Sequence, residues 1–228
     1  KILLNLRMSK YNIYIICKTE EEFLKKSNDI NDKYKNKICH IQWIPAEYLK
    51  LTQCNKKLLK DLNTRWNTGA KKTLAKLGNI AAHRKALLAI YMNKTDNNII
   101  LESDAEFSSK LGNPPDKSCY MGGWIIPPQI SKAGEKVNIN PKKGLNTIDY
   151  DKFAVIMTHA LFLKTFEEAI ELFQTTITDK IKNYDIHLKE LQYFKYYYYP
   201  PIFVQGKHVS EIEGNTNQND KHTYLYGL

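Results

Sequence analysis

The residues best suited to chemistry lie in one run at positions 98–107, NIILESDAEF. The apolar part of this run predicts a short, buried strand of a parallel sheet. Glu102 and Asp104 follow at the carboxyl end of the predicted strand. Because the two acids are spaced i and i+2, we expect their side chains on one face of an extended backbone.

Two carboxylates in this position suit a divalent cation. In an open α/β sheet, ligands bind at the carboxyl ends of central strands. Hard oxygen donors with no lysine or arginine among them favour Mn²⁺ or Mg²⁺ that bridges a diphosphate. The other interpretation is an acidic loop that caps a following helix, since acid-x-acid is a common tripeptide.

The elements that must position these carboxylates alternate between strand and helix. Besides the strand of the acidic run, strands are expected at 11–17, 38–44 and 154–163, and residues 120–128 are expected to form a strand that opens into a turn. Helices are expected at 19–29, 79–92 and 165–175. Thr165 and Glu168 have the spacing of a capping box. The alternation predicts an α/β layered sheet, and the length of the chain suits one such domain.

Other segments predict less regular structure. Residues 47–76 suggest broken helices and loops, residues 131–146 a mobile loop, and residues 179–189 a helix or a loop. Residues 196–204 form a further strand-like segment that contains four tyrosines and paired prolines. We interpret residues 1–10 as a disordered or non-native N-terminus, with Met8 as the natural start.

The charge of the chain favours an anionic partner. Its 228 residues carry a formal net charge of +10, which suits nucleic acid, a membrane surface or a nucleotide-sugar. The lysines are dispersed, with no block of like charges of the kind that marks a nucleic-acid-binding tail. We therefore expect no nucleic-acid partner.

The cysteines and the hydropathy indicate the compartment. Cys17, Cys39, Cys54 and Cys119 lack the spacing of a zinc site or a disulfide framework, so we expect buried or free thiols. No stretch has the roughly 20 apolar residues that a membrane span needs. These features predict a cytoplasmic protein.

Several short motifs stand in an order that resembles family 25 glycosyltransferases, the group of lipopolysaccharide and collagen galactosyltransferases. That family has Gly-Cys-x-x-Ser-His at a helix start, then an apolar strand ending in Glu-Asp-Asp-Ala, a Thr-His-Ala-Tyr element, a Val-Asp pair, and Pro-Pro-x-x-x-Gln before Ser-Asp-Ile. The similar segments here are GNIAAH at 78–83, ILESDA at 100–105, THAL at 158–161, YD at 184–185, PPIFVQ at 200–205 and SEI at 210–212. Asn79, Ala82 and Ser103 depart from the family's pattern.

The resemblance implies a single domain over residues 1–228 with a GT-A-like (Rossmann-like) fold and a central, mostly parallel sheet. It also implies an inverting transfer. The donor would be a UDP-sugar, with galactose or glucose as the sugar, and the acceptor a hydroxyl of a glycan or protein. Mn²⁺ or Mg²⁺ would lie on Glu102 and Asp104. His208 would be a third ligand, from a C-terminal tail at 206–228 that covers the active site. An exposed loop histidine is the alternative for His208.

The resemblance also implies roles for other residues. Asp185 would be the general base, and its alternative is a helix-capping or solvent-facing acid. His83 and His159 would lie near the donor or acceptor, although most such histidines are core residues bonded to a carbonyl. Gln205 would contact the donor. Gly123 would let a ligand approach the backbone beside Trp124, or else would form a tight turn.

Three other classes of function stay open. An inactive protein of the same fold could serve as a scaffold or sugar-binding subunit, as the substitution at Ser103 suggests. A basic polyanion-binding module would account for the charge. A nucleotidyltransferase or phosphohydrolase would share the acid-x-acid metal site but would release sugar phosphate or pyrophosphate instead of a nucleoside diphosphate.

Overall fold

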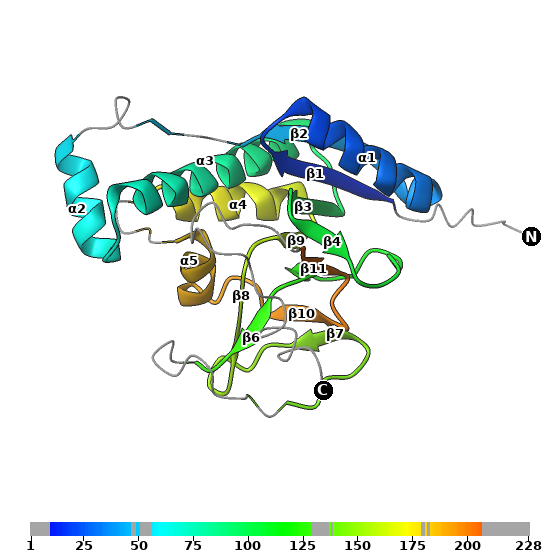
Figure 1. Cartoon of the computed structure of the whole chain (residues 1–228). Coiled ribbons are helices and arrows are strands. Elements are labelled where there is room, and N and C mark those ends of the chain that lie inside the picture. The colour runs from blue at the N-terminus through cyan, green and yellow to red at the C-terminus, as the bar shows by residue number, and fades with distance from the viewer. Residues whose placement is uncertain are drawn as a thin grey trace, which may run out of the picture.

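The computed structural model of the chain describes residues 10–46, 49–50, 56–128, 137, 139–178, 181 and 183–206. A seven-stranded sheet lies between helices, as Figure 1 shows. The predicted α/β class is therefore confirmed.

The helices and strands have the following bounds. The helices are α1 (Glu20–Tyr34), α2 (Lys56–Trp66), α3 (Ala70–Asn93), α4 (Phe166–Thr176) and α5 (Tyr184–Glu190), with the short 3-10 helix η1 (Lys35–Lys37) after α1. The strands are β1 (Tyr11–Cys17), β2 (Ile38–Pro45), β3 (Asn98–Glu102), β4 (Ala105–Phe107), β5 (Cys119–Tyr120), β6 (Trp124–Ile126), β7 (Gly144–Thr147), β8 (Ala154–Ile156), β9 (Ala160–Leu163), β10 (Tyr196–Tyr199) and β11 (Phe203–Gln205).

The main sheet has the strand order β2-β1-β3-β9-β5-β10-β7. Strands β2, β1, β3, β5 and β10 all run in one direction, whereas β9 and β7 run against them. The expectation of a mostly parallel sheet is thus met, with one antiparallel strand inserted next to β3. Two small antiparallel sheets, β4 with β11 and β6 with β8, complete the fold.

The core is divided between the two faces of the sheet, because side chains alternate along each strand. On β1, Tyr14 packs toward one face together with residues of α3, α4 and α5. Ile13 and Ile15 pack toward the other face, where Ile30 of α1 covers them. In Figure 1, α3 and α4 run side by side along one face, and α1 lies apart from them. The central strands are buried on both faces, which explains their continuous apolar sequence.

Helix starts follow the local sequence closely. Thr19 and Glu22 form a capping box at α1, and Thr165 and Glu168 form the predicted one at α4. The expected helix at 79–92 is part of the longer α3, whose buried face includes Ile80 and Leu87. Helix α3 is apolar on much of its surface because it packs against the sheet, α2 and α4.

Two predicted strands were wrong in their extent. Residues 154–163 do not form one strand: β8 belongs to a small sheet and β9 to the main sheet. The chain turns between them at Met157, whose φ is 80°. Residues 120–128 divide in the same way into β5 and β6, with a turn at Gly123, whose φ is 141°. A left-handed residue breaks the extended path, so the strands separate.

Other segments gave mixed outcomes. Residues 47–76 hold α2 and the start of α3, in line with the expected broken helices. The expected loop at 131–146 is wrong at its end, where Gly144 begins β7; residues 129–136 and 138 lie outside the described residues. The segment at 196–204 divides into β10 and β11.

Among the described residues, no helix has both the length and the apolar character needed to cross a membrane.

Candidate functional site

The candidate site lies at the carboxyl end of β3, which the sheet places between β1 and β9. Glu102 is the last residue of β3, and Ser103 and Asp104 form the turn that leads into β4. The expectation that both carboxylates lie on one face of an extended strand was therefore wrong. The chain bends after Glu102, so the two side chains reach different neighbours.

Glu102 lies against helix α3 and the start of β9. Its Oε1 accepts hydrogen bonds from Thr158 Oγ1 at 2.7 Å and from Asn79 Nδ2 at 3.1 Å. His83 Nε2 lies 3.5 Å from the same oxygen. Burial and the charge of Asp104 raise the pKa of Glu102 to about 7. Near neutral pH the carboxyl is therefore poised between its protonated and ionised forms.

Asp104 lies on the other side of the turn, against β11. Gln205 Nε2 donates to Asp104 Oδ2 at 2.7 Å, and the Gly206 amide donates to the Asp104 carbonyl at 2.6 Å. The pairing of β4 with β11 brings these residues together. Oδ1 of Asp104 is buried and finds no hydrogen-bond partner among the described residues. A buried carboxylate oxygen without a partner is costly, so Oδ1 calls for a partner that the described residues do not supply, such as a water, an ion or a ligand.

His83 combines a core position with contact to the site. It is fully buried on α3, and its Nδ1 lies 3.1 Å from the carbonyl of Asn79. Its ring packs on the Tyr184 ring with centroids 4.3 Å apart. Burial lowers its pKa to about 4, which keeps the ring neutral. The alternative of a core histidine bonded to a carbonyl is thus observed, yet Nε2 also faces Glu102.

His159 lies just before β9, next to the left-handed Met157. Its side chain is buried, and neither ring nitrogen has a hydrogen bond of ordinary geometry to a described residue. Burial lowers the pKa of His159, whereas the charge of Asp104 and the carbonyl of Phe203 raise it. His159 is therefore an unusually poorly satisfied buried side chain close to Asp104. The left-handed backbone of Met157 is strained, and strained backbone is concentrated at functional sites.

Two glycines after β5 allow this close packing. A Cβ on Gly122 would overlap the His159 ring and the Phe203 carbonyl. A Cβ on Gly123 would lie 2.6 Å from the Ile156 carbonyl. The need for glycine at both positions is explained by the protein's own packing. The role of Gly123 as a ligand contact stays a prediction.

Asp185 is in the first turn of α5, after the N-cap Asn183. Its Oδ1 accepts the Ile186 amide at 2.8 Å. Burial raises the pKa of Asp185, opposed in part by the charge of Lys76 on α3. The charge of Asp185 in turn raises the pKa of Glu102, which places Asp185 near the carboxylates. Asp185 is partly buried, so it is not the solvent-facing acid of the alternative interpretation, but its hydrogen bond in the first turn of α5 agrees with the helix-capping form of that alternative.

Several contributors escaped the sequence reasoning. Thr158 and Asn79 hold Glu102, although the motifs that contain them gave them no role. Lys26 of α1 binds the backbone on both sides of Asp104, although the acidic run itself contains no lysine or arginine. Nothing local in the sequence distinguishes Lys26 from its neighbour Lys25. The role of Thr158 could have been inferred from the sequence, because Thr158 stands beside His159 in the THAL motif at 158–161.

Among the described residues, Asp104 has the unpartnered carboxylate oxygen that a divalent cation would need, and further donors would have to come from a bound molecule. No three His, Cys, Asp or Glu side chains within the described part of the chain converge on one point. His208 lies outside the described residues. The unpartnered Oδ1 of Asp104 still offers a hard donor, with Glu102 nearby. Mg²⁺ and similar ions are often held by one or two carboxylates together with substrate phosphates.

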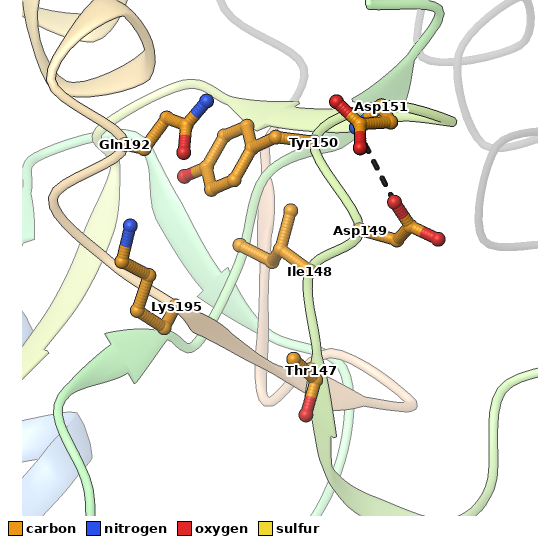
Figure 2. Close-up of a pocket in the computed structure, with 7 residues that line it drawn as sticks. All are labelled: Thr147, Ile148, Asp149, Tyr150, Asp151, Gln192 and Lys195. Atoms are coloured by element: carbon orange, nitrogen blue, oxygen red, sulfur yellow. Dashed lines mark hydrogen bonds between the residues drawn. The ribbon is translucent and has the colours of Figure 1, made fainter.

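A separate surface hollow is not part of this site. It has a volume of about 530 Å³ and is lined by residues that include Tyr150, Gln192 and Lys195 (Figure 2). Lys195 immediately precedes β10, and its carbonyl accepts the Ile148 amide at 2.9 Å. Strands β10 and β3 run in the same direction, so the start of β10 and the end of β3 lie at opposite ends of the parallel strands. The hollow therefore lies at the amino ends of these strands, away from Glu102.

Comparison of the chain with models of known protein families and with curated protein sequences finds no match. The fold and the site together define an α/β protein with two partly buried carboxylates in the turn that follows a central strand of its sheet.

Proposed function

We propose that this protein is a metal-assisted, inverting glycosyltransferase with a GT-A-like fold. It would move a hexose from a UDP-sugar to a hydroxyl of a glycan or protein, as its resemblance to family 25 implies.

The observation that carries the proposal is the convergence of distant motifs on two carboxylates. Segments at 78–83, 158–161 and 200–205 each supply a side chain that contacts Glu102 or Asp104. The segment at 184–185 brings Asp185 close enough for its charge to act on Glu102. A site shared by these motifs would account for their convergence.

The proposal assigns the metal to Asp104, with Glu102 beside it. When bound, the cation would neutralise the charge that develops on the departing diphosphate. Gln205 holds one oxygen of Asp104 and leaves the other unpartnered among the described residues. This arrangement orients Asp104 before a ligand arrives, which lowers the cost of binding.

Asp185 is the base in this proposal. The acceptor oxygen attacks the anomeric carbon, the bond from that carbon to the diphosphate breaks, and the hydroxyl proton passes to the Asp185 carboxylate. Inversion follows from this single displacement. A carboxylate whose pKa burial raises is a stronger base than an exposed one.

One observation favours a second candidate, an inactive nucleotide-sugar-binding protein with the same fold. Oε1 of Glu102 already accepts two hydrogen bonds, and Lys26 binds the backbone beside Asp104. Both features reduce the negative charge available to a metal. Such a protein would bind the donor and transfer nothing.

The proposal is tested by a thermal-shift screen of UDP, GDP, CMP and their sugars, each with Mn²⁺ or EDTA. A ligand at about 100 times its Kd should raise the Tm of a chain this size by roughly 5 to 10 °C. We expect such a shift for UDP and its sugars with Mn²⁺ only. Asp104→Asn should abolish the shift, because it removes the charge and leaves an acceptor for Gln205.

Asp116→Asn is the matched control, since it removes one exposed carboxylate that lies outside the turn with Asp104. Product analysis then separates the candidates. A transferase is supported if the unaltered chain releases UDP from a UDP-sugar and Asp185→Asn binds the UDP-sugar without releasing UDP. Binding without release supports the inactive protein, and release of sugar phosphate indicates a phosphohydrolase. No shift with any nucleotide contradicts both nucleotide-sugar candidates.

A further inference from the structure

Lys26 makes an unexpected connection between α1 and the carboxylates. Its ammonium donates a hydrogen bond to the Ser103 carbonyl at 2.8 Å and another to the Ala105 carbonyl. These carbonyls flank Asp104, so one side chain binds the turn on both sides of the candidate metal ligand. We call residues 102–105 the carboxylate turn.

The side chain of Lys26 is partly buried, in contrast to that of its neighbour Lys25, which is exposed. Burial lowers the pKa of Lys26, and the charges of Asp104 and Glu106 oppose that shift. A lysine gives up hydration when it is buried, so the contacts it makes must offset the loss. Its two carbonyl acceptors and the adjacent acids provide that offset.

The carboxylate turn is held from the end of β11 as well as from α1. Gly206 and Gln205 hold Asp104 from β11, and Lys26 holds the same turn from α1. Together they fix the turn from two directions, and Oδ1 of Asp104 remains buried without a partner among the described residues. The positive charge of the Lys26 ammonium also attracts the Asp104 carboxylate.

We propose that Lys26 is a positioning residue for the carboxylate turn, holding Asp104 in the orientation that binds a divalent cation with its nucleotide diphosphate. The role as it concerns the cation rests on the proposed function. Partners that orient metal ligands typically alter metal affinity by about 10-fold to 100-fold when they are removed.

The experiment compares Lys26→Met, Lys26→Arg and Lys25→Met with the unaltered chain. At saturating UDP, the apparent Kd for Mn²⁺ is measured by titration, and Tm without ligand is recorded for each variant. We expect Lys26→Met to weaken Mn²⁺ binding by about 10-fold or more. Lys26→Arg should recover much of the affinity, because a guanidinium can donate to both carbonyls. Lys25→Met should leave it unchanged.

A purely structural role would lower the Tm of Lys26→Met without changing the Mn²⁺ affinity of the folded protein, and that result would overturn the proposal. If Lys26→Met does not fold, Lys26→Gln takes its place, since it keeps an N–H donor without the charge. Failure of Lys26→Arg to bind Mn²⁺ better than the Met or Gln variant would also count against the proposal.

Hydrogen exchange without metal separates this inference from the proposed function. If the unaltered chain binds no nucleotide with Mn²⁺, the proposed function fails. The amides of the carboxylate turn should still exchange faster in Lys26→Met than in Lys25→Met if Lys26 holds the turn. Equal exchange in the two variants would overturn the positioning role itself.

Discussion

Glu102 shows how a single side chain can be held away from its ordinary ionisation. The side chain is only 20% exposed, and it lies near a second carboxylate. Thr158 and Asn79 donate to it, but their hydrogen bonds only partly offset the loss of water. The folded state therefore favours the protonated acid more than the unfolded chain does.

This pKa shift predicts a pH-dependent stability. The pKa of Glu102 rises from 4.5 in the unfolded chain to about 7 in the fold. The stabilising contribution is therefore fully present below pH 4.5 and is lost as the pH rises through 7. The Gln side chain of Glu102→Gln is neutral at every pH. At pH 8 the free energy of unfolding of this variant should exceed that of the unaltered chain by on the order of 2–3 kcal/mol.

The measurement is urea unfolding in EDTA at several pH values between 4.5 and 8. Glu171→Gln is the control, because it removes an exposed carboxylate on α4. Stability curves for Glu102→Gln and the unaltered chain that run parallel across this range would show that Glu102 ionises normally in the fold.

At the scale of elements, helix α4 supports α3, the helix that presents Asn79 and His83 to the site. The two helices lie side by side in Figure 1. The start of α4 is fixed by Thr165, whose hydroxyl accepts the Glu168 amide, and by the Glu168 carboxylate, which accepts the Thr165 and Lys164 amides. Stability of α4 therefore depends on a short, local pattern.

Thr165→Ala should lower the free energy of unfolding by about 1 kcal/mol, because it leaves an amide of the first turn without its acceptor. Thr165→Ser keeps the hydroxyl, so its free energy of unfolding should fall much less than that of Thr165→Ala. Urea denaturation of the two variants measures the difference. An equal loss in both would indicate that the threonine methyl group, and not the cap, supplies the stability.

At the scale of the whole molecule, one sheet joins segments from Tyr11 to Tyr199 and both core clusters lie against it. The chain has tryptophans in separate parts of the fold: Trp43 on β2, Trp66 on α2 and Trp124 on β6. Tryptophan fluorescence therefore reports on regions that are distant in sequence.

We expect the chain to unfold as one cooperative unit, because the two core clusters share every central strand. Transitions in urea followed by tryptophan fluorescence and by far-ultraviolet circular dichroism should coincide. Two separated transitions would indicate independently folding parts and would contradict the single domain predicted from the sequence.

The sequence by itself determined the local features of this protein. Alternating and apolar runs fixed the positions of β1, β2 and β3, and a threonine with a glutamate three residues later fixed the start of α4. These signals act between residues near in the chain, so they survive in a single sequence. The presence of carboxylates at the end of a central strand was also predictable.

Only the tertiary structure decided how the site is assembled. Gln205 reaches Asp104 across 101 positions of sequence, and Lys26 reaches the Ser103 carbonyl across 77. The bend after Glu102 and the division of 154–163 into β8 and β9 likewise depend on which sheet each segment joins. Such contacts follow from the packing of helices on a sheet and from pairing of distant strands, which local periodicity does not encode.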